Sequence, residues 1–192
     1  MTLPTWVPDD ETKPAPMPLL VVQSFVNTWE ADSGVDLLRD PVAGPQWLEQ
    51  AGLADGPTDL VEARKIRETV RALLVQNSDG RAPDPFRLRA LRDLANRVRL
   101  RAAVLDDGSV EVQSDEDSAA SLVPLLLIIR DAQRDGSWER LKACRNPDCR
   151  WAYYDRSHAG RGAWCDMAVC GNRMKNRNLR ARRSAGPSRS AP

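Results

Sequence analysis

The stretch Leu141–Arg183 reads LKACRNPDCRWAYYDRSHAGRGAWCDMAVCGNRMKNRNLRARR and carries all four cysteines of the 192-residue chain. The cysteines form two pairs of identical C-x4-C spacing, and fifteen residues separate the pairs. Two such pairs can supply four thiolates, which is a ligand set that structural zinc takes in tetrahedral geometry. We therefore predict one structural Zn2+ held by Cys144, Cys149, Cys165 and Cys170.

Two disulfides are the alternative to a metal site. The N-terminus lacks the basic-then-apolar pattern of a secretory signal, so we expect a reducing cytoplasm, where paired cysteines more often bind metal. The longest apolar run, Leu122 to Ile129, is eight residues long and contains Pro124. A membrane span needs about twenty residues. These features favour zinc over disulfides, and they predict a cytoplasmic protein with no membrane segment.

Turn and cap residues suggest how the two cysteine pairs are built. Asn146-Pro147-Asp148 lies inside the first pair and is a turn sequence. Residues 151–154 read as one strand of a hairpin, and Asp166 is a good N-cap for a helix that continues to Arg183. A knuckle, a hairpin and a ligand-bearing helix form a treble-clef-like zinc finger. The metal would replace the core that about forty residues cannot build.

The second cysteine pair lies in Trp164–Arg173, which reads WCDMAVCGNR and is followed by Lys175. This run resembles the signature of the CGNR zinc-finger family, and the first pair, followed by Trp151, Tyr153, Tyr154 and Asp155, also matches that family. Members usually carry an N-terminal helical ABATE domain and are described as candidate stress-induced transcription regulators. Phe25-Val26-Asn27-Thr28 resembles a short motif near the start of ABATE domains, although Ser24 stands where members often have an acid.

The preceding part of the chain predicts helices and one hairpin. Helices are expected at about residues 40–50, 58–76, 84–98 and 117–134, and a helix or strand at 19–30. The charged residues of the helix at 58–76 are expected to form a solvated surface. Leu60, Ala63, Ile66, Val70, Leu73 and Leu74 recur at helical spacing and predict one buried stripe. Strands at about 100–105 and 109–113 flank the turn Asp106-Asp107-Gly108. The fold class is therefore mainly α with one short β-hairpin, as a helical N-terminal domain plus a small zinc finger.

Composition divides the chain into four segments. Residues 1–18 contain five prolines and predict a mobile leader, 19–137 form the helical ABATE-like domain, 138–183 form the finger, and 184–192 form a disordered tail. From Lys142 to Pro192 there are twelve Lys/Arg and three Asp, a net charge of +9. The preceding 141 residues carry sixteen basic and twenty-four acidic residues, a net charge of −8. The basic end suits a polyanionic partner.

The basic C-terminal helix is the main functional candidate. Arg173, Arg177 and Arg180 recur at i, i+4 and i+7 and share one face, and Lys175 and Arg182 lie on a neighbouring face. Such cations bind phosphates through counterion release, while asparagine side chains can bind base edges. The predicted nucleic-acid-binding residues are Asn172, Arg173, Lys175, Arg177, Arg180, Arg182 and Arg183.

These observations favour a zinc-dependent DNA-binding transcription regulator. One finger buries too little surface for high specificity, so a homodimer on two half-sites is expected. The N-terminal domain would dimerise, sense a small molecule or contact a protein partner. The alternative is an adaptor whose finger binds RNA or protein. Catalysis is not expected, because His158 is the only histidine and no nucleophile–base pattern is present.

Overall fold

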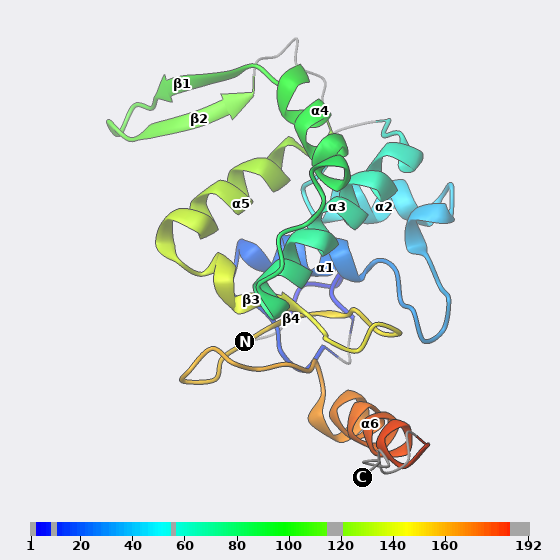
Figure 1. The fold of residues 1–192 in the computed structure, drawn as a ribbon. Helices are drawn as coiled ribbons and strands as arrows, with labels where there is room; N and C mark the ends of the chain where they lie inside the picture. The colour runs from blue at the N-terminus through cyan, green and yellow to red at the C-terminus, as the bar shows by residue number, and fades with distance from the viewer. Residues whose placement is uncertain (1–2, 9–10, 55–56, 115–120, 185–192) are drawn as a thin grey trace.

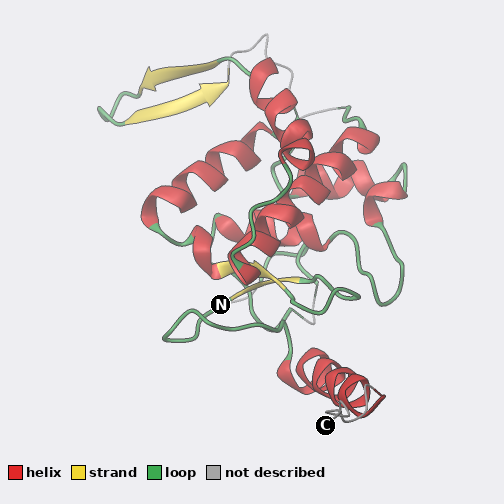
Figure 2. Cartoon of the chain, viewed as in Figure 1, coloured by secondary structure: helices red, strands yellow, loops and turns green. Residues whose placement is uncertain are grey.

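The computed structural model describes residues 3–8, 11–54, 57–114 and 121–184. The chain is mainly helical, with two small antiparallel strand pairs and four cysteines gathered near its C-terminal end (Figure 1; Figure 2), which confirms the predicted fold class. The α-helices are α1 Leu19–Asn27, α2 Ala43–Gln50, α3 Leu60–Asp79, α4 Arg89–Arg97, α5 Val123–Asp135 and α6 Asn172–Ser184. The strands are β1 Leu100–Val104, β2 Val110–Ser114, β3 Leu141–Ala143 and β4 Ala152–Tyr154. Single helical turns are η1 Leu37–Arg39, η2 Pro85–Leu88, η3 Trp138–Arg140 and η4 Met167–Gly171.

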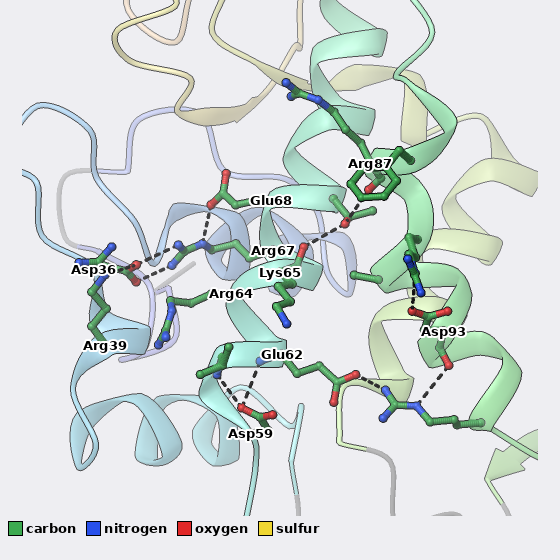
Figure 3. Close-up of a pocket in the computed structure, with 16 residues that line it drawn as sticks. Asp36, Arg39, Asp59, Glu62, Arg64, Lys65, Arg67, Glu68, Arg87 and Asp93 are labelled. Carbon is green, nitrogen blue, oxygen red and sulfur yellow. Dashed lines mark hydrogen bonds and ion pairs between the residues drawn. The ribbon is translucent and has the colours of Figure 1, made fainter.

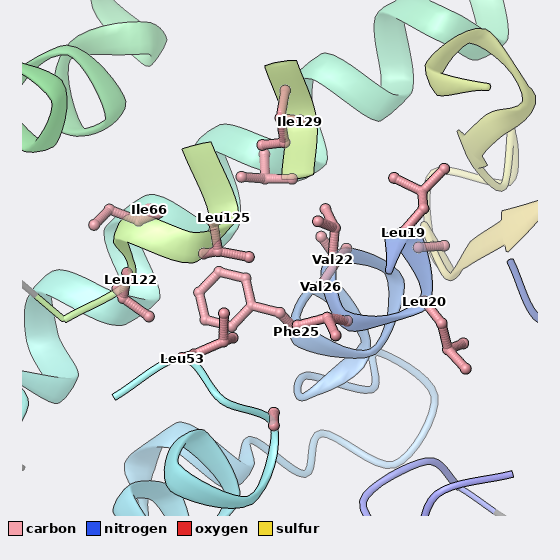
Figure 4. Close-up of a cluster of buried hydrophobic side chains, with 14 of the residues drawn as sticks. Leu19, Leu20, Val22, Phe25, Val26, Leu53, Ile66, Leu122, Leu125 and Ile129 are labelled. Carbon is pink, nitrogen blue, oxygen red and sulfur yellow. The ribbon is translucent and has the colours of Figure 1, made fainter. Parts of the chain in front are cut away.

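Helix α1 is the hub of the core, because every one of its residues is buried. A helix that is buried on all sides must be surrounded, and α3, α5 and β4 all pack against this one. Phe25 lies at the centre of the cluster in Figure 4, near Leu53, Leu122 and Leu125. It also stacks on Trp47, with ring centroids 6.4 Å apart. The core is thus built around the segment that carries the Phe-Val-Asn-Thr motif.

Helix α3 follows the predicted stripe but has different ends. Asp59 caps its start, one residue after the predicted first position, by accepting hydrogen bonds from the N–H groups of Val61 and Glu62. The helix continues through Asp79 into residues predicted as a loop, and ends at Gly80, which adopts the left-handed conformation at φ +74°. The buried apolar residues of the stripe are Ala63, Ile66, Val70 and Leu74.

Two charged residues of α3 correct the prediction of a solvated surface. Arg67 and Arg71 are only 3% and 5% exposed. Arg67 donates to both carboxylate oxygens of Asp36, and Arg71 donates to the carbonyl of Val26 at 2.7 Å. A buried guanidinium has five donors that need partners. Here Glu68 of the same helix accepts from both arginines, and the other partners come from segments distant in sequence.

The hairpin and the last helix of the N-terminal domain agree with the sequence pattern. Strands β1 and β2 pair antiparallel from Leu100↔Ser114 to Val104↔Val110. Helix α5 begins at Val123 and places Pro124 in its first turn, where proline is tolerated; the predicted start at 117–120 lies outside the described residues. Phe86 falls within the helix predicted at about 84–98, but it lies in the single turn η2 before α4 begins and is 73% exposed.

The proline-rich N-terminal segment was predicted as a mobile leader, and its described residues are packed instead. Val7 and Ala15 are buried. The ring of Trp6 meets Trp47 edge-on at 6.2 Å, and the carbonyl of Lys13 accepts a hydrogen bond from the N–H of Tyr154 in β4. The segment therefore lies along the finger and closes one edge of its sheet. At the other end, Ser184 belongs to α6, and residues 185–192 of the predicted tail lie outside the described part.

Within the described ranges, no helix is long and apolar enough to cross a membrane.

Candidate metal centre and basic helix

The four cysteines converge on one point. Their sulfur atoms all lie within 4.8 Å of one another, and the Sγ–Sγ distances from Cys165 to Cys149 and to Cys170 are both 3.7 Å. Four sulfurs placed tetrahedrally about 2.3 Å from a zinc ion would be about 3.8 Å apart. All four cysteines are free thiols rather than two disulfides. The donor set therefore fits one Zn2+, as the spacing predicted.

The first pair sits on a knuckle that follows β3. The carbonyl of Asn146 accepts hydrogen bonds from the N–H groups of Cys149 and Arg150, which closes the turn predicted at Asn146-Pro147-Asp148. Arg150 takes the left-handed conformation, at φ +56°, so that the chain can reverse into β4. The Asn146 side chain donates to Cys170 Sγ at 3.8 Å. The knuckle thus positions the sulfurs of Cys144 and Cys149 and also contacts the sulfur of Cys170.

The second pair spans a wide helical turn. Asp166 caps it as predicted, accepting from the N–H of Val169 at 2.8 Å. The turn η4 is a π-helix, in which the N–H of Gly171 bonds to the carbonyl of Asp166, five residues back. This extra residue per turn lets Cys165, before the turn, and Cys170, inside it, face the same site. Helix α6 continues directly from η4, so the metal ligands fix where the basic helix begins.

Proximity couples the ionisation of the thiols. Hydrogen bonds from the thiols of Cys149 and Cys165 lower the pKa of Cys144 to about 2. The same contact with Cys144 raises the pKa of Cys149 to about 12 and raises the pKa of Cys165. One thiolate therefore opposes the formation of the others, and four thiolates at this distance require a cation among them.

A buried ion pair joins β3 to the residue that follows β4 in the finger. Lys142 Nζ lies 2.8 Å from Asp155 Oδ2, and both side chains are about 5% exposed. Burial alone would raise the pKa of Asp155, but hydrogen bonds from Lys142, Ser157 and Gly162 outweigh it and hold the pKa well below its usual range. A Cβ on Gly162 would lie 2.8 Å from Asp155 Oδ1, so glycine is needed beside the carboxylate. The sequence pattern did not single out this pair.

The aromatic residues of the finger pack against its interior. Tyr153 is 1% exposed, and its hydroxyl donates to the carbonyl of Gly162 at 2.9 Å. Trp151 donates from Nε1 to Glu11 at 3.2 Å, while Trp164 lies against the cysteine cluster. These rings therefore pack as part of the finger's interior and do not form an open platform for stacking bases.

Side chains of the helical domain hold the finger strand β4 by its backbone. Asn27 of α1 accepts a hydrogen bond from the N–H of Ala152 at 2.8 Å and donates to the carbonyl of the same residue at 2.9 Å. Gln23 donates to that carbonyl as well. Arg71 of α3 donates to the carbonyl of Arg150 at 2.8 Å. Asn27, part of the Phe-Val-Asn-Thr motif, thus connects the helical domain to the finger.

Helix α6 is exposed along its whole length, and none of its residues is buried. Figure 1 shows it beyond the finger, at the end of the molecule opposite the β1–β2 hairpin. Arg173 pairs with Asp32 of the loop after α1, and Arg177 pairs with Asp148 of the knuckle, at 3.0 and 3.1 Å. The other predicted cations, Lys175, Arg180, Arg182 and Arg183, form no ion pair with any residue that the structure describes. Asn172, at the start of the helix, donates to the carbonyl of Ala168.

A charged groove of about 1090 Å³ lies on the helical domain, between α3, η1 and the η2–α4 segment (Figure 3). Its charges are largely paired with one another. Arg67 binds Asp36, Arg97 binds Glu62, and Asp59 is engaged in capping α3. Because so few of its polar groups are uncommitted, the groove does not by itself specify a ligand.

Two family models match the chain. Residues 140–183 match the CGNR zinc finger. Residues 21–134, more than half of the chain, match the ABATE family, described as "Putative stress-induced transcription regulator". A search of curated proteins finds no match. The chain therefore belongs to the ABATE family and carries a C-terminal CGNR zinc finger.

Proposed function

We propose that this protein is a zinc-dependent DNA-binding transcription regulator in which α6 docks on duplex DNA. The observation that carries the proposal is the exposure of α6 throughout its length, with six Lys/Arg among its thirteen residues. A short helix that is mostly polar and has no buried residue is only marginally stable in water. A polyanion would neutralise the repulsion between its cations and provide the missing contacts.

The zinc would act structurally. Cys144, Cys149, Cys165 and Cys170 would hold it, and it would supply fixed geometry and no reaction step. Cys170 lies two residues before Asn172, where α6 starts, so the four cysteine ligands set the direction in which the helix leaves the finger. With four thiolates and one Zn2+ counted, the segment from Lys142 to Pro192 changes from +9 to about +7, which remains suited to DNA.

The helical domain would orient the finger and carry the regulatory contacts. Asn27 and Arg71 fix β4 and the knuckle to the core, so that α6 has a defined place relative to the whole chain. Dimerisation, small-molecule sensing or a protein partner would act through this domain. A homodimer would supply the second half-site that one finger needs for specificity.

Selection from a pool of random duplex DNA by the zinc-loaded full-length protein, at near-physiological salt, tests the proposal. The control replaces all six basic residues of α6 with glutamine, after its zinc content and circular dichroism are matched to wild type. A recovered motif that the control loses supports regulation through DNA. Retention of single-stranded RNA in preference to duplex DNA would favour the RNA adaptor, and absence of retention of either would refute nucleic-acid binding.

A further inference from the structure

We propose that one face of α6, centred on Leu179, is the surface that enters the DNA major groove, and that Arg173 and Arg177 instead face the body of the chain and make no direct contact with DNA. This inference rests on the proposed function, because it assigns the partner's contacts within the same helix. It differs from the sequence prediction, which placed Arg173, Arg177 and Arg180 on the primary binding face.

The first argument is that two arginines of the predicted face are turned to the protein. Arg173 contacts both carboxylate oxygens of Asp32, at 3.0 and 3.1 Å, and Arg177 contacts Asp148 at 3.1 Å. Met174, the one partly buried residue of α6, lies beside them on the helix. Each ion pair is exposed and contributes little stability by itself. Together they show which side of α6 faces the body of the chain.

The second argument is the composition of the remaining side. Leu179 is 47% exposed and has charged and amide side chains around it on the helix surface. Its neighbours three, four and seven positions away form one continuous face, here called the outward face: Asn172, Lys175, Asn176, Leu179, Arg182 and Arg183. Its cations form no ion pair within the described residues.

The chemistry of the outward face matches the major groove of B-form DNA. Asparagine side chains can bind adenine N6 and N7, an apolar side chain contacts the thymine methyl group, and flanking lysine and arginine bind guanine or phosphate. The thirteen residues of α6 span about 20 Å, enough to cross a groove about 12 Å wide. A-form RNA has a major groove too narrow for a helix, so the surface fits duplex DNA rather than duplex RNA.

Two double variants with equal charge loss test the assignment. Lys175→Gln/Arg182→Gln alters the outward face, and Arg173→Gln/Arg177→Gln alters the body-facing side. The probes are the random duplex DNA pool and its selected sequence, with duplex RNA of the same sequence as a comparison. We expect the outward variant to lose about 100-fold in affinity, with a salt slope smaller by about two. The body-facing variant should lose less than about threefold, in line with the loss of long-range attraction alone.

A third variant tests whether the ion pairs with Asp32 and Asp148 keep Arg173 and Arg177 from contacting DNA. Asp32→Asn/Asp148→Asn frees both paired arginines, and Asp106→Asn/Asp107→Asn on the distant hairpin tip is its charge-matched control. We expect the two variants to bind alike. If freeing the arginines tightens binding tenfold more than the control does, those arginines are masked DNA contacts and the assignment is overturned.

Other outcomes also decide between the proposals. Equal losses from both glutamine variants, or a larger loss from the body-facing one, overturn the outward face while leaving DNA binding intact. Failure of the wild-type protein to bind any duplex overturns the proposed function itself. Suppose that Leu179→Ala keeps the wild-type sequence preference while Lys175→Gln/Arg182→Gln binds more weakly. The outward face would then contact only phosphates, which contradicts its role in reading bases.

Discussion

Replacing Asn27 with alanine removes the bridge between α1 and the finger strand. Asn27 is 6% exposed and Ala152 is fully buried, and their two hydrogen bonds measure 2.8 and 2.9 Å. The Ala152 carbonyl keeps a second donor in Gln23, but its N–H has no other partner among the described residues. Two lost hydrogen bonds of about 1 kcal/mol each, with one buried N–H left unpaired, should lower the free energy of unfolding by about 3 kcal/mol. For a chain of this size the melting temperature should fall by about 6–12 °C.

Urea unfolding of the zinc-loaded protein, followed by circular dichroism, measures this change. Asn96→Ala, at an exposed position on α4, is the matched control and should change stability by less than about 0.5 kcal/mol. The Asn27 variant should also release zinc to a chelator faster, because β4 leads out of the knuckle. A loss no larger than the control's would refute the reasoning that the helical domain holds the finger through this side chain.

Three further predictions concern the finger. Lys142→Met leaves the buried carboxylate of Asp155 without its cation, and the urea midpoint should report a loss of about 3 kcal/mol; a loss below about 1 kcal/mol would contradict the pairing. Because folding lowers the pKa of Asp155, its carboxylate stabilises the folded protein fully above about pH 4, and this contribution is lost as the pH falls further. The difference in unfolding free energy between wild type and Asp155→Asn should therefore narrow below that pH. A Cβ on Gly171 would lie 2.5 Å from Met167 Sδ and 3.2 Å from Trp164 Cδ1, so Gly171→Ala should cost about 1 kcal/mol, and adding Met167→Ala should restore it. An unchanged melting temperature in the single variant would show that Met167 moves aside freely.

The metal site and most helices could be predicted because their signals are local. Cysteine spacing within a short stretch limits the ways four sulfurs can meet, and Asp166 capped the following helix as expected. Asp106-Asp107-Gly108 marked the β1–β2 hairpin for the same reason, since turn residues act through their own backbone. The π-form of the turn η4 was not predicted, because α and π turns differ by one residue and share the same composition.

Features that depend on distant contacts could not be predicted. The segment 3–18 looked mobile because proline cannot join regular structure, yet its backbone carbonyls can still accept hydrogen bonds from the finger. Arg67 and Arg71 looked like surface charge, because the neighbouring Glu68 is the one partner visible in the local sequence; the distant partners Asp36 and the Val26 carbonyl offset the cost of burying them. The periodicity of α6 grouped its arginines correctly by face, but Asp32 and Asp148 decide which face is turned to the protein.

The most direct test of the central claim compares DNA binding before and after metal removal. The duplex selected by the zinc-loaded protein would be titrated with that protein, with chelated protein, and with chelated protein resupplied with Zn2+. We predict one zinc ion per chain. Removing the zinc with a chelator should weaken the affinity for the duplex by at least 100-fold, and resupplying Zn2+ should restore it fully. Undiminished affinity of the zinc-free protein for the same duplex would contradict the claim that the four-cysteine site positions α6 for recognition.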